Sequence, residues 1–389
     1  MNILLLSQFF SITRGGGEYV LSIVAKKLAE NGHKVWIITN KITDEDYKNI
    51  DNVKMVFIPP TLEYKGGLPP GFLDNMRYFF NAVVRGRKII KKEKIDIIHS
   101  NNFAPALAGS VLSHITSKPH ITAIWDIFSL CGKDYWQKWI SQIGVSRIHA
   151  FLGPRFEKLI LKLPHSAIHT ISEASKDDLV KFGATKPIHV ILPTIEKTEC
   201  YTKNSNSSQF VYVGRLVFYK NLEVIIKAID IVKKTEPEIK LIIIGGGPHK
   251  KPLEDLTRSL GVETNVEFVG YVSAEEKMKT IANSSAMVFP SLCEGFGLVI
   301  LEAFSQHKPI LVSNIRPMSD IVPHGQTGYV LDPYDENIWA QHMLKIIKNP
   351  QESAEMGKKG NRLLTTYYNQ ESMYQKIMEM YDSCVKKEI

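Results

Sequence analysis

The stretch Ala286–Glu302 constrains the fold more than any other part of the chain. It begins Ala-Met-Val-Phe-Pro-Ser, which predicts a buried strand that ends in a turn. Gly295 and Gly297 come after the turn, and apolar residues at helical spacing come after the glycines. The stretch therefore predicts a strand, a glycine loop and a helix start in direct succession.

Two carboxylates flank this junction, Glu294 before the glycines and Glu302 in the helix. A helix start offers unpaired backbone N–H groups and the positive end of the helix dipole, which together favour phosphate oxygens. Carboxylates do not bind phosphate, so we expect these two to accept hydrogen bonds from hydroxyl groups. A ligand that carries both hydroxyls and phosphates is most simply a nucleotide sugar.

A second phosphate-binding pattern lies earlier in the chain. Phe210–Val213 predicts a strand and Gly214 a turn, and Arg215 and Lys220 follow before a helix that starts near Leu222. Two cations over a helix start make a clamp for a diphosphate, through charge pairing and bidentate hydrogen bonding. The alternative is a pair of ordinary surface charges.

The two patterns together resemble a known family. Glu294-x7-Glu302 with the filling GFGLVILEA, and the pattern GRL…KN from Gly214 to Asn221, resemble the retaining GT-B glycosyltransferases of the family called GT4. The resemblance covers nearly all of the chain. It implies an α/β fold of two Rossmann-like domains facing each other across a cleft, with a C-terminal helix that crosses back to the first domain. It also implies retaining transfer of a sugar from a UDP- or GDP-linked donor to an acceptor hydroxyl.

The resemblance assigns roles to side chains of the second domain. Glu294 is expected to bind the donor sugar hydroxyls, and Glu302 the ribose hydroxyls. Arg215 and Lys220 are expected to stabilise the leaving diphosphate, and with Glu294 they are the expected catalytic residues. Further donor contacts are expected at the nucleobase and along the glycine loop, from Gly270, Phe296, Gly297 and Leu298.

The N-terminus repeats the strand–loop–helix order. Asn2–Leu6 predicts a buried strand, and Gly15–Gly17 precede a run of apolar residues at helical spacing. The glycines are contiguous, which does not fit the spacing of an NAD-binding loop. By the resemblance, Gly16 and Gly17 face the donor phosphates and sugar. A flexible glycine hinge is the alternative.

Three residues are candidates for the acceptor side: His99, Trp125 and Asp126. His99 ends a predicted strand, although a lone histidine there is more often structural. Trp125 occupies a position where many relatives have a histidine, so it supplies no general base, and Asp126 follows it. The departure need not block the reaction, because retaining enzymes of this class are thought to use the leaving phosphate as the base.

Composition limits the function classes. The chain has 389 residues and 48 Lys and Arg against 40 Asp and Glu, a formal net charge of +8. That charge suits phosphates or an anionic membrane, and no nucleic-acid-binding motif is present, so nucleic acid is not an expected partner. The four cysteines have no CxxC spacing, and no Asp-x-Asp pair lies near the site, so we expect neither a metal nor another cofactor.

The chain length predicts two domains. We expect an acceptor domain over residues 1–195, a polar Asn/Ser-rich linker over 196–208 and a donor domain over 209–370. The crossing helix is expected at about 371–389. Met1–Leu6 lacks the basic start and the length of a signal peptide, which favours a cytoplasmic protein.

Residues 133–163 combine tryptophans, aliphatic residues at helical spacing and interleaved Lys and Arg. Basic, aromatic and amphipathic character together describe a helix in a membrane interface. We therefore expect peripheral contact with an anionic membrane and a lipid-linked glycan or glycolipid acceptor. Core-facing helices with solvated lysines are the alternative.

Two other functions fit parts of the sequence. A nucleotide-sugar 2-epimerase shares the two-domain architecture, but its catalytic pattern differs from the one found here. A non-catalytic GT-B scaffold that binds a partner is favoured by Trp125 and opposed by the intact Arg215, Lys220, Glu294 and Glu302.

Overall fold

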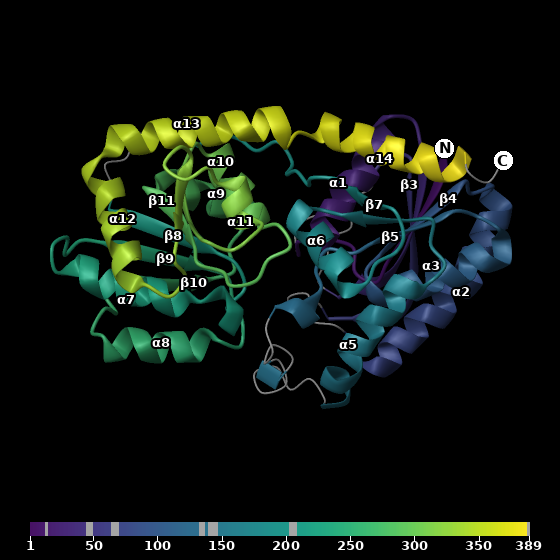
Figure 1. The fold of residues 1–389 in the computed structure, drawn as a ribbon, viewed down its shortest axis with the longest axis horizontal. Coiled ribbons are helices and arrows are strands. Elements are labelled where there is room, and N and C mark those ends of the chain that lie inside the picture. Colours follow the sequence, from purple (N-terminus) through teal and green to yellow (C-terminus); the bar gives the residue numbers. More distant parts are fainter. Residues whose placement is uncertain are drawn as a thin grey trace. The chain divides into compact units, whose positions relative to one another are not determined.

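The computed structural model describes residues 1–11, 15–43, 50–63, 70–131, 137–138, 147–201 and 208–386. The chain forms two compact units (Figure 1). The N-terminal unit comprises Met1–Gly132, Ser146–Thr194 and Gln370–Ile389. The main part of the C-terminal unit is Ile195–Asn369.

The N-terminal unit is built on a parallel seven-stranded sheet in the order β3-β2-β1-β4-β5-β6-β7. The strands are β1 (Asn2–Ser7), β2 (Lys34–Ile42), β3 (Val53–Leu62), β4 (Ile97–Asn101), β5 (His120–Ala123), β6 (Ala167–Thr170) and β7 (Ile188–Val190). The helices are α1 (Gly17–Glu30), α2 (Phe72–Glu93), α3 (Phe103–Thr116), the short η1 (Phe128–Leu130), α5 (Arg147–Lys162), α6 (Glu173–Phe182) and α14 (Gln370–Val385).

The C-terminal unit has a parallel six-stranded sheet in the order β10-β9-β8-β11-β12-β13. The strands are β8 (Gln209–Val213), β9 (Lys240–Ile244), β10 (Val266–Gly270), β11 (Ala286–Phe289), β12 (Ile310–Ser313) and β13 (Gly328–Leu331). The helices are the short η2 (Phe218–Lys220), α7 (Leu222–Lys233), α8 (Lys250–Ser259), α9 (Ala274–Asn283), α10 (Leu298–Ser305), α11 (Met318–Ile321), α12 (Glu336–Lys348) and α13 (Pro350–Tyr367).

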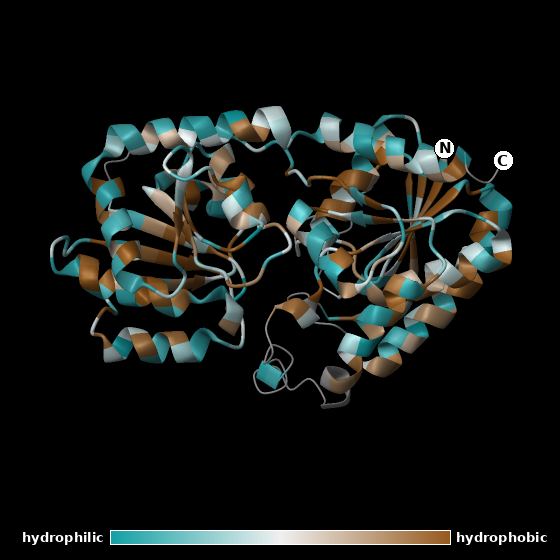
Figure 2. Ribbon diagram, viewed as in Figure 1, coloured by the Kyte–Doolittle hydropathy of each residue, from teal (hydrophilic) through white to brown (hydrophobic). Residues whose placement is uncertain are grey.

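The strands form because their apolar runs can be buried on both faces. Residues 3–6 of β1 are fully buried, and Figure 2 shows the strands of this sheet as largely hydrophobic between helices of mixed character. A parallel sheet covered on both faces requires such uninterrupted runs. The prediction of an α/β fold with two Rossmann-like units is confirmed.

Each sheet reverses its strand order beside its first strand. The reversal lies between β1 and β4 in one unit and between β8 and β11 in the other. In open α/β sheets, ligands bind outside the carboxyl ends of the strands at such a switch point. The Gly15–Gly17 loop follows β1, and the segments with Arg215 and Glu294 follow β8 and β11, so the predicted site residues lie at these edges.

The C-terminal helix returns to the N-terminal unit, as predicted. The Tyr381 hydroxyl of α14 lies 2.8 Å from His99 Nδ1, and the Tyr374 hydroxyl lies 3.0 Å from His33 Nε2. Lys27 of α1 pairs with Glu371 at 3.2 Å. Helix α14 is thus held to α1 and to the centre of the sheet.

Helix α13 belongs to the C-terminal unit and packs closely on the end of α10. A Cβ on Gly357 would lie 1.8 Å from the His307 carbonyl oxygen, and one on Gly360 would lie 2.4 Å from the Phe304 ring. The two glycines therefore allow α13 to approach the helix that carries Glu302.

The structure adds two long helices that the sequence patterns did not predict, α2 and α13. Both mix apolar and charged residues along their length, and their buried positions are few. No helix among the described residues is both long enough and apolar enough to cross a bilayer.

Candidate active site

Lys220 and Glu294 meet at the switch point of the C-terminal sheet. Lys220 ends η2 after β8, and Glu294 lies in the loop after β11, next to β8 in the sheet. The Lys220 ammonium forms a charge-assisted hydrogen bond with Glu294 Oε1, which also accepts one from the Ser291 hydroxyl at 2.7 Å. The neighbouring strands therefore join two residues that are 74 positions apart in the chain.

This ion pair is largely shielded from solvent. The side chains of Lys220 and Glu294 are 10% and 14% exposed, and the Lys220 ammonium lies 5.2 Å from the centres of the Tyr219 and Phe289 rings. A shielded pair has a stronger attraction than a surface pair, but each charge has also lost much of its hydration. A ligand that offers both an anion and hydroxyl groups can satisfy both partners.

Arg215 lies near Lys220 in the same connection. Its guanidinium donates a hydrogen bond to the Tyr219 hydroxyl at 2.9 Å, and its carbonyl accepts one from the Tyr212 hydroxyl at 3.0 Å. Burial is the main cause that raises the pKa of Tyr212 well above its usual value, so its hydroxyl stays protonated and can donate that bond. Both the side chain and the backbone of Arg215 are thus held by tyrosines.

The Gly245–Gly247 loop after β9 packs directly on the backbone that carries Arg215. A Cβ on Gly245 would lie 2.0 Å from the Gly214 carbonyl oxygen, and one on Gly247 would lie 2.3 Å from that of Leu216. Gly270, at the end of β10, accepts a hydrogen bond from the Gly245 N–H at 2.7 Å. Only glycine fits at Gly245 and Gly247, so the loop shapes the site by backbone contact.

The start of α10 has the form expected of an anion site. Gly297, with φ of 91°, precedes the helix in the left-handed region, and no side chain caps the first turn. The N–H groups of Leu298 and Val299 therefore have no intrahelical acceptor. Phe296 is buried and its ring lies 5.7 Å from that of Tyr368, which fixes the loop.

Glu302 lies one turn further along α10. Its Oε1 pairs with the Lys277 ammonium of α9 at 2.7 Å, whereas its Oε2 is buried and has no hydrogen-bond partner. A buried carboxylate oxygen without a donor is costly. The atom is therefore ready to accept a hydrogen bond from a ligand hydroxyl. Sequence patterns did not reveal Lys277, because nothing in its spacing links it to Glu302.

At the N-terminal sheet edge, Trp125 lies against the start of α1. A Cβ on Gly17 would lie 2.4 Å from the Trp125 indole nitrogen, which donates a hydrogen bond to Asn101 Oδ1 at 2.6 Å. Trp125 is 5% exposed, and Gly16 is exposed with open space around it. The tryptophan is thus a buried wedge between β4, β5 and the glycine loop. Asp126 follows it, partly exposed.

His99 lies in the core of the N-terminal unit. Its Nδ1 bonds the Tyr381 hydroxyl and its Nε2 lies 3.3 Å from His169 Nδ1. The His169 ring in turn lies edge-on to Trp125, with the ring centres 5.0 Å apart. Burial lowers the pKa of His99 to about 3, so the imidazole is neutral. This is the structural role that its place at a strand end favours.

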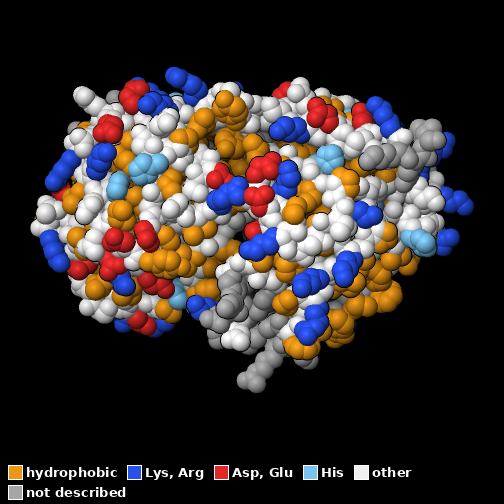
Figure 3. All heavy atoms as spheres, viewed as in Figure 1, with side chains coloured by type: hydrophobic (Ala, Val, Ile, Leu, Met, Phe, Trp, Pro, Cys, Tyr) orange, Lys and Arg blue, Asp and Glu red, His pale blue; other side chains and the backbone are white. Residues whose placement is uncertain are grey.

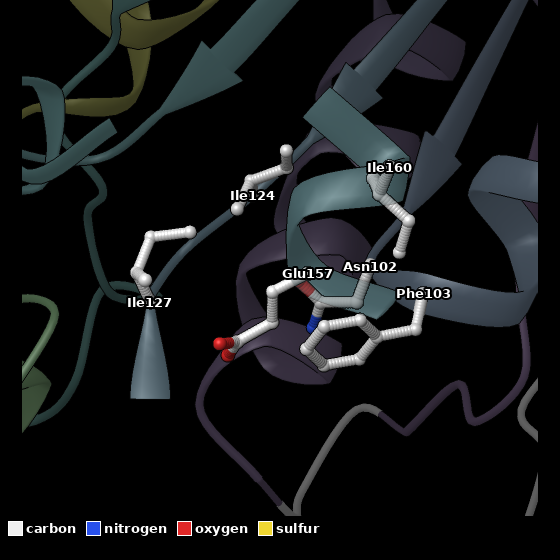
Figure 4. Close-up of a pocket in the computed structure, with 6 residues that line it drawn as sticks. All are labelled: Asn102, Phe103, Ile124, Ile127, Glu157 and Ile160. Atoms are coloured by element: carbon white, nitrogen blue, oxygen red, sulfur yellow. The ribbon is translucent and has the colours of Figure 1, made fainter. Parts of the chain in front are cut away.

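A small cavity lies near the same edge, lined by Asn102, Phe103, Ile124, Ile127, Glu157 and Ile160 (Figure 4). Its volume of about 10 Å³ is room for a single water molecule. Glu157 of α5 is 2% exposed and accepts a hydrogen bond from the Ser129 N–H at 3.2 Å. Its buried carboxylate thus helps to hold η1 against α5.

Within the described residues, no group of three or more His, Cys, Asp or Glu side chains is placed to hold a metal ion. The predicted independence from metal stays a prediction.

Two family models match consecutive parts of the chain. "Glycosyltransferase Family 4" matches residues 14–198, and "Glycosyl transferases group 1" matches residues 195–363. The chain belongs to the GT-B glycosyltransferases of family 4. The two matches follow the two units of this glycosyltransferase closely.

Similar proteins span most of this family 4 glycosyltransferase. An uncharacterized glycosyltransferase of Methanocaldococcus jannaschii is 26% identical over 80% of this chain and 79% of its own. A sucrose-phosphate synthase from Thermosynechococcus elongatus superposes with a TM-score of 0.82 over 99% of both chains, at 18% identity. The Anabaena HepE protein, solved in complex with UDP-glucose, superposes with a TM-score of 0.74 over 98% of this chain and 100% of its own, also at 18% identity.

Proposed function

We propose that this glycosyltransferase moves a sugar from a UDP- or GDP-linked donor to an acceptor hydroxyl with retention of the anomeric configuration, and that it needs no metal. The observation that carries the proposal is the group formed by Arg215, the Lys220–Glu294 pair and the uncapped start of α10, with the unpartnered Glu302 oxygen beside it. Solved relatives with UDP and UDP-glucose support the choice of donor.

The ion pair gives the donor a place to exchange contacts. Before the donor binds, Lys220 and Glu294 neutralise each other in a site that is largely shielded from solvent. When it binds, the diphosphate takes the ammonium and the sugar hydroxyls donate to the carboxylate. Each charge keeps a partner throughout, so the exchange avoids the cost of an isolated buried charge.

The chemical step breaks the bond between the anomeric carbon and the diphosphate oxygen, whose electron pair leaves with the diphosphate. The acceptor oxygen bonds to the same face of the anomeric carbon, and its proton passes to the leaving phosphate. Lys220, Arg215 and the N–H groups of Leu298 and Val299 oppose the negative charge that grows on the diphosphate. No protein base is required, which accommodates the buried Trp125.

We further propose a lipid-linked glycan or glycolipid acceptor, reached from the cytoplasmic side of a membrane. Part of the segment 133–163, including Trp136 and Trp139, lies outside the described residues. The described part of α5 exposes Phe151, Leu152 and Leu159 together with Arg155, Lys158 and Lys162. Its opposite face, with Ile160 and Leu161, is buried in the core. One helix thus combines a core face with a basic, apolar outer face.

The first test is calorimetric titration of the full chain with UDP, GDP and ADP, for the wild type and for Glu302→Ala. We expect one nucleotide to bind, and the substitution to weaken it about 10- to 100-fold, the scale of losing hydrogen bonds to a charged group. Glu275→Ala, on the exposed side of α9, is the matched control and should bind like the wild type. If no nucleotide binds the wild type, the non-catalytic scaffold becomes the better account.

A further inference from the structure

Helix α2 has two faces of very different character. The residues Tyr78, Ala82, Gly86 and Ile90 recur every four positions and face the core. A Cβ on Gly86 would lie 2.6 Å from Leu112 of α3, so α2 is packed tightly against its neighbour on that side. The inner face alone accounts for the attachment of α2 to the domain.

The outer face carries large apolar side chains that touch water. Phe72, Leu73, Phe80 and Val84 are between 57% and 69% exposed, and Met76 is 36% exposed. At 100° per residue, Leu73, Phe80, Val84 and Lys91 fall within about 40° of one line along the helix. Scattered exposed apolar residues are normal in soluble proteins, but a continuous stripe of them is not.

Basic residues extend and flank this stripe. The exposed Lys and Arg of α2 are Arg77, Arg85, Arg87, Lys88, Lys91 and Lys92. The acidic residues of the helix, Asp74 and Glu93, are less exposed, and each lies within salt-bridge distance of a basic neighbour in α2. The outer face is therefore apolar in its first part and strongly positive in its last.

Helix α5 presents a similar outer face in the same layer. Helix α3 packs against both α2 and α5, so the two helices flank it on one side of the sheet. Figure 3 shows hydrophobic side chains along the outer edge of α2, with Lys and Arg side chains beside them and over the neighbouring elements. The two basic, apolar faces thus belong to one side of the N-terminal unit.

The charge on this face narrows the choice of occupant. A second copy docking through the same face would bring two positive surfaces together, which is unfavourable. A nucleic acid would pair with the Lys and Arg but would leave the aliphatic stripe without a partner. An anionic bilayer offers negative headgroups for the basic residues and acyl chains for Leu73, Phe80 and Val84.

We propose that the outer face of α2 docks in the plane of an anionic membrane, with its apolar stripe at the headgroup–acyl boundary and its Lys and Arg on the headgroups. The face of α5 adjoins it as a secondary contact. This inference rests on the proposed function in one respect: a lipid-linked acceptor is the reason for the protein to dock on a membrane. Binding to the bilayer itself does not depend on glycosyl transfer. It places the main contact in a helix outside the segment 133–163.

Vesicle co-sedimentation of the full chain tests the proposal. The vesicles are made of phosphatidylcholine alone or with about a third of phosphatidylglycerol, and the variants are Leu73→Gln/Phe80→Gln and Lys88→Gln/Lys91→Gln/Lys92→Gln. We expect the wild type to bind anionic vesicles at low salt, to bind neutral ones far more weakly and to dissociate as salt is raised. Each variant should weaken binding about 100-fold. The first loses the burial of two large apolar side chains, and the second loses about fivefold in affinity for each lysine removed.

Matched controls distinguish a specific effect of this face from non-specific hydrophobic binding and from misfolding of the variants. Val180→Gln removes another exposed apolar residue, on α6, and should bind like the wild type. All substituted side chains are exposed, so each variant should keep the wild-type circular dichroism and nucleotide affinity.

Several outcomes would overturn the proposal. The wild type and the α2 variants could bind anionic vesicles equally well, or the wild type could fail to bind them. The α2 variants could also bind normally while Phe151→Gln/Leu159→Gln on α5 loses binding. Sedimentation velocity without vesicles would reveal a dimer that the α2 variants dissolve, which would assign the face to a second copy. A chain that binds vesicles through α2 but binds no nucleotide would defeat the proposed transfer and leave the membrane face intact.

Discussion

The two sheets share a parallel, doubly wound topology, yet their switch-point edges are chemically opposite. The edge of the C-terminal sheet carries charged side chains in partial contact with solvent, with Lys220 on Glu294 and Lys277 on Glu302. The edge of the N-terminal sheet carries neutral, buried rings, with the His169 ring between those of Trp125 and His99. The fold is the same, and the side chains at its edge decide the chemistry.

Burial explains the difference. A fully buried imidazole loses its charge, and burial lowers the pKa of His99 to about 3. Lys220 and Glu294 keep some solvent contact and each other, which suits a charged ligand. The phosphate chemistry that we propose therefore belongs to the C-terminal edge, and the N-terminal edge contributes shape.

The largest effect should come from removing the charge at the C-terminal edge. Lys220→Ala should lower kcat by roughly 10²–10³-fold, because the departing diphosphate loses a preorganised cation. Steady-state transfer or donor hydrolysis measures this, with Lys279→Ala on the exposed side of α9 as the control. The double variant Lys220→Ala/Glu294→Ala should fold better than Lys220→Ala, which leaves a carboxylate without its partner. A kcat within twofold of the wild type would remove Lys220 from the mechanism.

The next effect should come from protonating buried histidines of the N-terminal unit. Burial lowers the pKa of His99 to about 3 and that of His165 to about 4, both below the ordinary 6.5. The unfolded chain therefore takes up protons first as the pH falls below about 6.5, and stability is lost progressively toward pH 4. Each of these two histidines should cost about 2 kcal/mol at pH 5.

Urea unfolding at pH 7.5 and pH 5.0 measures this loss. His165→Gln should make it smaller by about 2 kcal/mol, since both His165 ring nitrogens are buried without a partner. An unchanged pH dependence in the variant would show that His165 takes up its proton as readily in the folded protein as in the unfolded chain.

The smallest effect should come from disturbing shape alone. Gly17→Ala places a Cβ 2.4 Å from the Trp125 indole nitrogen and should destabilise the N-terminal unit by about 1–3 kcal/mol, the range for overpacking. Combining it with Trp125→Ala should relieve the clash. The double variant should therefore lose less unfolding free energy than the two single variants lose when their effects are added. Gly16→Ala has open space and is the control. Equal melting temperatures for the wild type and Gly17→Ala would contradict the tight packing of Trp125 against Gly17.

Local patterns predicted much of this molecule. The apolar runs predicted the strands that carry the site, and the glycines at Gly214 and Gly297 predicted the turns that position Arg215 and the start of α10. These features depend on neighbours within a few residues, which the sequence displays directly. The helix α2 was missed because its buried positions are few and its apolar stripe faces outward.

Pairings between distant residues were beyond such patterns. Lys220 and Glu294 were each predicted for the site, but their ion pair exists because β8 and β11 are neighbours in the sheet. The partners Lys277 of Glu302 and Tyr381 of His99 come from helices that packing brings to those positions. Even the role of Trp125 depends on the space left by Gly17.

The sequence by itself determined the two α/β units, the family and the residue types at the proposed donor site, because strand periodicity, glycine turns and charge are local properties of the chain. Only the tertiary structure decided which charges are paired, which histidines are neutral and which face of α2 meets solvent. Those properties depend on burial and on contacts between residues tens to hundreds of positions apart, and these exist only once the sheets and helices have packed.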